Sequence, residues 1–240
     1  MAFGSQKTGC LVIVFALAWP AAALDFPARH RHWRGGCAGI LTLDADGAGF
    51  RQTAAKKKPH AWRWKWEDIQ QLELGDDRRV RILSYRDRAL ALGRDQAYEF
   101  VLDGAPDLLA ARELLGSVMD GRFVARLAAP GERLLWELPV KRIRRNAGPQ
   151  GLLRVYEDRV VFAAAKAGES RTWRDADIEM ISSAGPFELS IVTFERGGRF
   201  DFQARQRLDA ARYEALWLRL ESLRGLRLLH ESIQTKETAR

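Results

Sequence analysis

The chain has few cysteines and no long apolar run, which argues against a disulfide-rich protein and against a membrane-spanning segment. Only Cys10 and Cys37 occur in 240 residues, so an internal disulfide framework is not expected. The apolar stretch from Cys10 to Trp19 is about half of the roughly 20 residues that cross a bilayer. Sequence signatures of enzymes are missing too: there is no His-Glu-x-x-His, Gly-x-Ser-x-Gly, Cys-x-x-Cys or Walker-type phosphate loop. We therefore expect a protein that is not an enzyme, needs no cofactor and is stabilised by packing.

The N-terminus is typical of a secretory signal peptide. Lys7 is the only charge before Asp25, and the apolar run is followed by the small residues Ala21-Ala22-Ala23. We expect cleavage near Ala23 and a periplasmic or secreted protein. The alternative is a protein anchored in the inner membrane by an uncleaved signal.

The net charge of +8 favours acidic partners. An excess of basic residues in a cytosolic protein would indicate nucleic-acid binding, but the expected export argues against that partner. Anionic lipid headgroups and acidic polymers remain as binding partners, and a solvated basic surface is the plainer interpretation.

One segment occurs twice along the chain. The matched pairs are Gly39 and Gly151, Phe50 and Phe162, Trp64 and Trp173, and Asp68 and Asp177. This repeat predicts two related domains at residues 24–131 and 132–228, after a signal peptide at 1–23 and before a polar tail at 229–240.

Each copy is expected to contain several short strands followed by one helix. Turn residues and period-2 alternation predict strands at Gly39–Leu43, Gly49–Thr53, Trp62–Trp66, Val80–Tyr85, Ala89–Leu92, Tyr98–Leu102, Phe123–Leu127 and Leu134–Val140. Helices are predicted to begin near Asp107 and Asp209 and to end near Gly121 and Gly225. We expect Trp64 and Trp173 in the core, and expect the carboxylates of Asp68 and Asp177 to accept backbone N–H bonds at turns.

The elements in this order resemble the pleckstrin-homology-like fold, including its bacterial and GRAM-type relatives. The resemblance rests on Gly39-x-Leu41-x-Leu43, Gly49-Phe50 and Trp66-x-Asp68-Ile69, with counterparts at Gly151-x-Leu153-x-Val155, Val161-Phe162 and Trp173 to Ile178. It implies a mainly β (α+β) protein of two such units, each a bent antiparallel sheet or partly open barrel capped by one helix. It also implies binding rather than catalysis, so we expect a non-catalytic binding or scaffold module of the bacterial envelope.

An unidentified envelope protein is the expected partner, recognised through an exposed sheet edge or the groove beside a helix. The alternative is peripheral binding to anionic lipid or acidic polymer through basic surfaces. The candidate contacts are Lys56, Lys57, Lys58, Lys141, Arg142, Arg144 and Arg145.

A metal site is the other candidate. His30-x-His32 on a strand would place both imidazoles on one face, and Cys37 and His60 could add two more ligands. Copy two has Arg142, Arg144 and Pro149 where copy one has His30, His32 and Cys37. From the sequence we therefore expect an ordinary polar edge with no metal, and Cys37 either buried or cross-linking a dimer.

Overall fold

The computed structural model describes residues 23–32, 35–53, 59–88, 91–145 and 147–223. Residues 1–22 of the expected signal peptide, Lys56–Lys58 and the expected tail at 229–240 lie outside the described residues. Of the helices in the described part of the chain, none combines the length and apolar character needed to cross a bilayer.

Strands dominate the described residues. In the first half they are β1 (Leu24–His32), β2 (Gly35–Leu43), β3 (Gly47–Gln52), β4 (Ala61–Lys65), β5 (Ile69–Gly75), β6 (Arg79–Arg88) and β7 (Ala91–Leu102), followed by the helix α1 (Leu108–Val118) and β8 (Phe123–Arg126). The second half contains β9 (Leu134–Arg142), β10 (Gln150–Tyr156), β11 (Arg159–Ala164), β12 (Arg171–Arg174), β13 (Ile178–Gly185), β14 (Glu188–Thr193), β15 (Arg199–Ala204) and the helix α2 (Ala210–Ser222). Short 3-10 turns, Trp66–Asp68 and Asp175–Asp177, precede β5 and β13.

The strands form one continuous sheet, in the order β13-β14-β15-β9-β10-β11-β12-β8-β5-β6-β7-β1-β2-β3-β4. The order β5-β6-β7-β1-β2-β3-β4 of the first half recurs in the second as β13-β14-β15-β9-β10-β11-β12. The expected pair of separate, helix-capped pleckstrin-homology-like sheets is therefore wrong: the described residues form a single 15-stranded mixed sheet with two helices.

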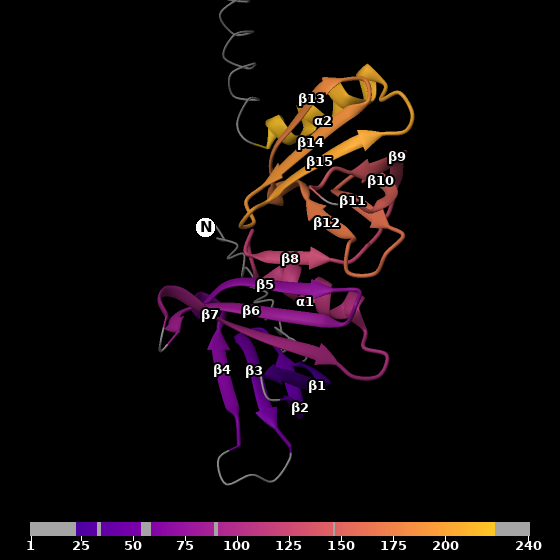
Figure 1. Cartoon of the computed structure of the whole chain (residues 1–240). Coiled ribbons are helices and arrows are strands. Elements are labelled where there is room, and N and C mark those ends of the chain that lie inside the picture. Colours follow the sequence, from indigo (N-terminus) through magenta and orange to yellow (C-terminus); the bar gives the residue numbers. More distant parts are fainter. Residues whose placement is uncertain (1–22, 33–34, 54–58, 89–90, 146, 224–240) are drawn as a thin grey trace, which may run out of the picture.

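Strand β8 is the physical reason for this difference. It pairs in parallel with β5 and antiparallel with β12, so it joins the two halves edge to edge (Figure 1). A sheet edge exposes unpaired N–H and C=O groups, and β8 satisfies those groups on both halves at once. The sequence predicted a strand here but gave no sign of its partners, because strand pairing depends on residues far apart in the chain.

Two groups of buried apolar side chains lie along this sheet. Phe50, Trp64 and Phe100 belong to the first, which also contains Ala111 and Leu115 of α1. The second contains the corresponding Phe162, Trp173 and Phe202, with Leu216 and Leu220 of α2. Trp64 and Trp173 are only 1% and 3% exposed, which confirms the prediction that both are core residues.

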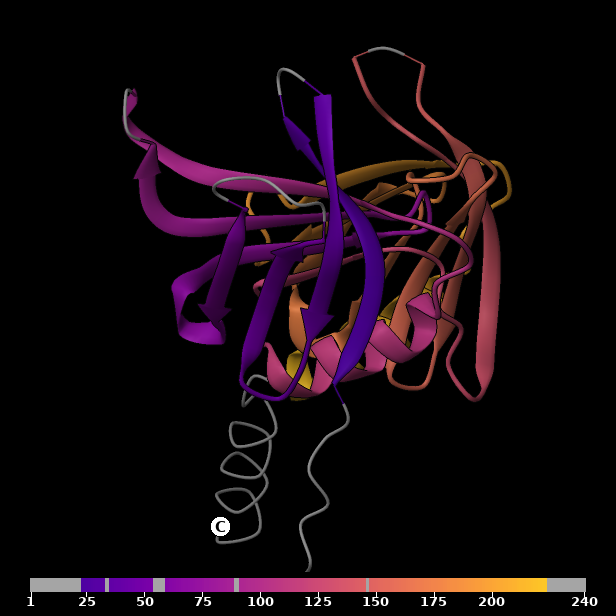
Figure 2. The ribbon, with the colours of Figure 1, turned by 90° about the horizontal axis from the view of Figure 1, so that it is seen from below.

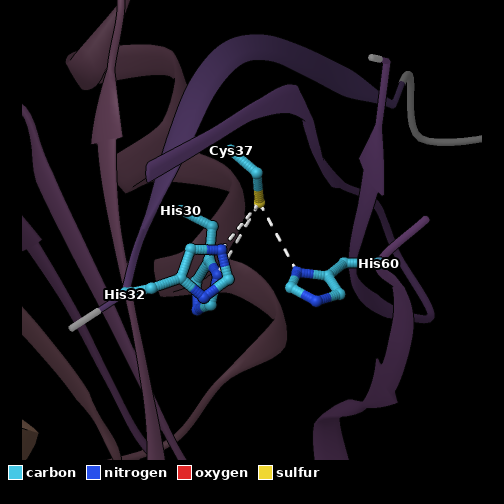
Figure 3. A group of neighbouring side chains, drawn as sticks. All are labelled: His30, His32, Cys37 and His60. Carbon is cyan, nitrogen blue, oxygen red and sulfur yellow. Dashed lines mark hydrogen bonds between the residues drawn. The ribbon is translucent and has the colours of Figure 1, made fainter. Parts of the chain in front are cut away.

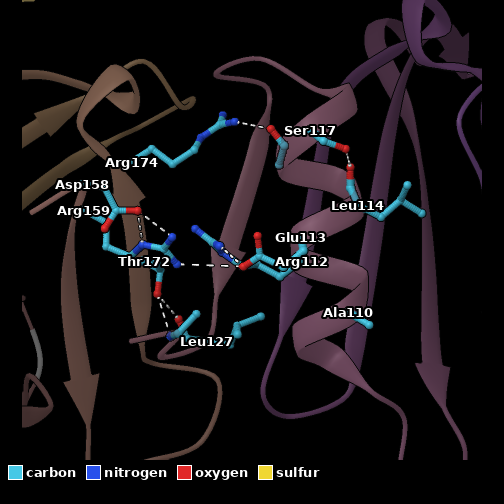
Figure 4. A network of polar contacts seen from close by, with 12 residues as sticks. Ala110, Arg112, Glu113, Leu114, Ser117, Leu127, Asp158, Arg159, Thr172 and Arg174 are labelled. Carbon is cyan, nitrogen blue, oxygen red and sulfur yellow. Dashed lines mark hydrogen bonds and ion pairs between the residues drawn. The ribbon is translucent and has the colours of Figure 1, made fainter. Parts of the chain in front are cut away.

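Helix α1 also contacts the second half of the chain (Figures 2 and 4). Arg174 donates to the backbone oxygens of Gly116, Met119 and Asp120, at the C-terminal end of the helix. Carbonyl oxygens at a helix C-terminus have no partner within the helix and carry partial negative charge, so a guanidinium is well placed there.

The predicted helix starts and turns are confirmed. Asp107 and Asp209 accept from the backbone nitrogens of Ala110 and Arg212, which begins each helix. The carboxylates of Asp68 and Asp177 accept from the backbone nitrogens of Lys65 and Arg174, at 3.3 and 3.0 Å.

Candidate metal centre

The hairpin of β1 and β2 supplies three of the four candidate ligands. Phe26, Ala28 and His30 of β1 are buried on one face, and His32 follows on that face where the strand leaves the core. Cys37 of β2 lies directly opposite His30 and is also buried. The metal hypothesis considered His30 and His32 on one strand, and β1 contains both.

The fourth candidate, His60, comes from the segment that precedes β4. Its backbone nitrogen donates to Oε1 of Gln52 at 3.1 Å, and its carbonyl oxygen accepts from the Gln52 nitrogen at 2.9 Å. These bonds to the last residue of β3 hold His60 beside the hairpin, although the two segments are separated in sequence.

The three imidazoles surround the thiol of Cys37 (Figure 3). The Cys37 Sγ atom lies 3.2 Å from Nε2 of His32, 3.5 Å from Nδ1 of His60 and 3.9 Å from Nδ1 of His30. One ligand atom from each residue lies within 4.8 Å of every other. A tetrahedral ion with bonds of about 2.3 Å to sulfur and 2.0 Å to nitrogen would separate those ligand atoms by about 3.5 Å. The observed sulfur–nitrogen distances span this value.

Aromatic rings enclose the inner side of this cluster. The ring of His30 lies 4.7 Å from Trp62, 5.3 Å from Phe100 and 6.0 Å from Phe50, between centroids. Trp62 also lies 4.9 Å from His60. His32 is exposed, so the cluster has a dry side toward the core and an open side toward solvent.

The surroundings favour the neutral form of the His30 imidazole. Burial, followed by the charges of His32 and His60, lowers the pKa of His30 to about 4. Neutral imidazole is the form that binds metals, so a proton competes weakly for His30 near neutral pH.

The matching position of the second half carries fixed charges instead. Arg144 forms an ion pair with Glu169 at 2.8 Å, and the guanidinium of Arg142 lies 4.3 Å from the centre of the Phe200 ring. Burial, followed by the charges of Arg144 and Arg171, lowers the pKa of Arg142 to about 10. The second half thus has its own cations and an acid where the first half has three histidines and a cysteine.

The basic residues predicted as partner contacts differ from one another in burial and in pairing. Arg142 is half-buried, Arg144 is paired with Glu169, and Lys141 and Arg145 are exposed. Lys141 and Arg142 are consecutive in β9, so their side chains leave opposite faces of the strand. Lys56, Lys57 and Lys58 lie outside the described residues.

The sequence contained one clear signal for this site. Three of the four histidines and one of the two cysteines of the chain belong to this cluster. The aromatic enclosure by Trp62 and the anchor at Gln52 were missed, because both arise from strand pairing.

Comparisons with known proteins do not identify the chain. No protein-family model and no curated protein matches it. A solved structure described as "Structure of the Spt16D Pob3N heterodimer" is similar with 12% sequence identity and a TM-score of 0.29, over 72% of this chain and 84% of that chain. A TM-score this low does not establish a shared fold, so the resemblance to pleckstrin-homology-like domains stays a prediction.

Proposed function

We propose that this protein is a non-catalytic metal-binding protein of the bacterial envelope, and that His30, His32, Cys37 and His60 hold one transition-metal ion. The convergence of four ligand atoms within 4.8 Å carries this proposal. It replaces the expectation of an ordinary polar edge, which rested on the different residues in copy two.

The ligand set supports binding rather than catalysis. Four protein ligands complete a tetrahedral shell, whereas catalytic zinc sites keep one position open for water or substrate. Imidazole and thiolate are also the ligands that zinc and copper accept, while magnesium and calcium require oxygen. The export expected from the N-terminus would place the site in the envelope.

Titration of the purified full-length protein with Co²⁺ tests the proposal. We expect one ion per chain and the visible absorption of a tetrahedral thiolate complex. Cys37→Ser should abolish that absorption, and His30→Ala should weaken the binding of the ion. His230→Ala is the matched control, because His230 is the one histidine of the chain outside the proposed ligand set. Wild-type protein that forms a stoichiometric complex with neither Co²⁺ nor Cu⁺, or equal binding by Cys37→Ser, would refute the proposal.

A second candidate is binding to another envelope protein at the ends of the sheet. Within the described residues, β4 pairs only with β3 and β13 only with β14, so each leaves an edge for strand addition. Ser182→Pro in β13 should weaken the binding of such a partner, because proline has no backbone N–H to donate to an added strand. Unchanged binding in this variant would exclude that edge.

The alternative of anionic lipid or acidic polymer has its own test. Surface charges are screened beyond about 10 Å at 0.1 M salt. Cosedimentation with vesicles that contain anionic lipid should therefore fall when salt is raised, and should be absent with neutral vesicles. Equal binding to both kinds of vesicle would exclude a charge-based contact.

A further inference from the structure

The charge of the ligand set indicates which ion the site takes. Cys37 supplies one negative charge as a thiolate, and the three imidazoles are neutral ligands. In the described part of the chain, no carboxylate joins the group of potential ligand atoms. A divalent ion would leave the complex with one positive charge, whereas a monovalent ion would make it neutral.

The surroundings disfavour the excess charge. Trp62, Phe50 and Phe100 pack around His30, and an uncompensated charge in such apolar surroundings is costly. Zinc-bound histidines almost always donate their second N–H to a carboxylate, a carbonyl or water, and a carboxylate there would offset the charge. Among the described residues, no carboxylate accepts a hydrogen bond from His30 or His60.

The second half of the chain has an acid at the position that corresponds to His60. Trp62 pairs with Phe50 in the first half, and Arg171 pairs with the corresponding Phe162 in the second. His60 and Glu169 each lie two residues before these partners, so they occupy corresponding positions. There the carboxylate of Glu169 neutralises Arg144. The first half has a histidine at the position of that acid and so lacks its negative charge.

We propose that the ion bound by His30, His32, Cys37 and His60 is monovalent copper, in preference to Zn²⁺. This inference rests on the proposed function and adds the identity of its ligand. Cu⁺ accepts soft thiolate and imidazole ligands, and with one thiolate it gives a complex without net charge.

A pair of variants at His60 isolates the charge. His60 faces the thiol through Nδ1, the ring nitrogen nearer the backbone, so an aspartate or asparagine oxygen can occupy that position. His60→Asp adds a second negative ligand and makes a Zn²⁺ complex neutral, whereas His60→Asn has nearly the same shape without the charge. His32 faces the thiol through Nε2, so His32→Glu and His32→Gln form a second pair at an exposed site that tolerates substitution.

The experiment measures the affinity of the purified protein for Cu⁺ and for Zn²⁺ by competition with chromogenic chelators, without oxygen for Cu⁺. We expect the wild type to keep Cu⁺ in the presence of excess Zn²⁺. The ratio of Zn²⁺ to Cu⁺ affinity should rise at least about a hundredfold from His60→Asn to His60→Asp, since one unit of charge about 4 Å away at an effective dielectric constant of about 20 corresponds to roughly a thousandfold.

The outcomes separate this inference from the proposed function. Equal ratios in the acid and amide variants of both pairs, or displacement of Cu⁺ from the wild type by Zn²⁺, would overturn the inference and leave metal binding intact. Binding of neither ion by the wild type would overturn both.

Discussion

Arg174 is predicted to hold the two halves of the molecule together through helix α1. Its guanidinium donates to the oxygens of Gly116, Met119 and Asp120 at 2.6, 3.3 and 3.2 Å. Asp177 accepts from the same guanidinium at 2.9 and 2.7 Å and thereby fixes its orientation. The side chains are 27% and 14% exposed, so the pair is partly shielded from water.

Removal of Asp177 should therefore be costly. Asp177→Ala leaves a partly buried arginine without its carboxylate, and breaking a buried pair in this way costs about 3–5 kcal/mol. We expect about 3 kcal/mol because of the partial exposure. In a chain of this size that loss lowers the midpoint of thermal unfolding by roughly 6–12 °C.

Asp68 provides the matched control. It occupies the same position in the first half, where Lys65 replaces Arg174 and its ammonium lies 3.3 Å from Glu67 at the surface. Asp68→Ala should cost about 1 kcal/mol, since it removes one backbone hydrogen bond.

Urea unfolding of both variants measures these losses in the free energy of unfolding. The same measurement on Arg174→Met and on the double variant with Asp177→Ala completes a double-mutant cycle. The cycle should give a coupling energy of about 2 kcal/mol between Arg174 and Asp177. Equal losses in Asp177→Ala and Asp68→Ala, or a coupling energy near zero, would refute the role assigned to Arg174.

Two further predictions concern the core and the pH dependence of stability. Trp64→Ala and Trp173→Ala should each cost about 3–5 kcal/mol in urea unfolding, whereas Trp217→Ala at the surface of α2 should cost less than about 1 kcal/mol; similar losses in all three would contradict the assigned core. Burial is the largest cause that raises the pKa of Glu195 from 4.5 to about 7, so the native state holds this proton more tightly and the free energy of unfolding should fall as pH rises from about 4.5 to 7. Glu195→Gln should remove up to about 3 kcal/mol of this decrease in the free energy of unfolding. If the variant and the wild type show the same pH dependence, Glu195 does not cause the decrease.

The sequence determined the local elements well. Alternation and turn residues predicted the strands that became β2, β3, β6 and β8, and single capping residues such as Asp107 and Asp209 began the helices where expected. These features depend on neighbours within a few residues, so a single sequence contains them. The strand β1 was missed, because Pro27 and the charged residues around it obscure its alternation.

Only the tertiary structure decided how the halves join and what the histidines do. The repeat predicted two separate sheets, but β8 completes the open edges of both and makes one sheet. In the same way His60 reaches Cys37 only because Gln52 binds its backbone beside the β1–β2 hairpin. Both outcomes depend on pairing between distant segments, whose register is set by the packing of the whole sheet and not by any local pattern.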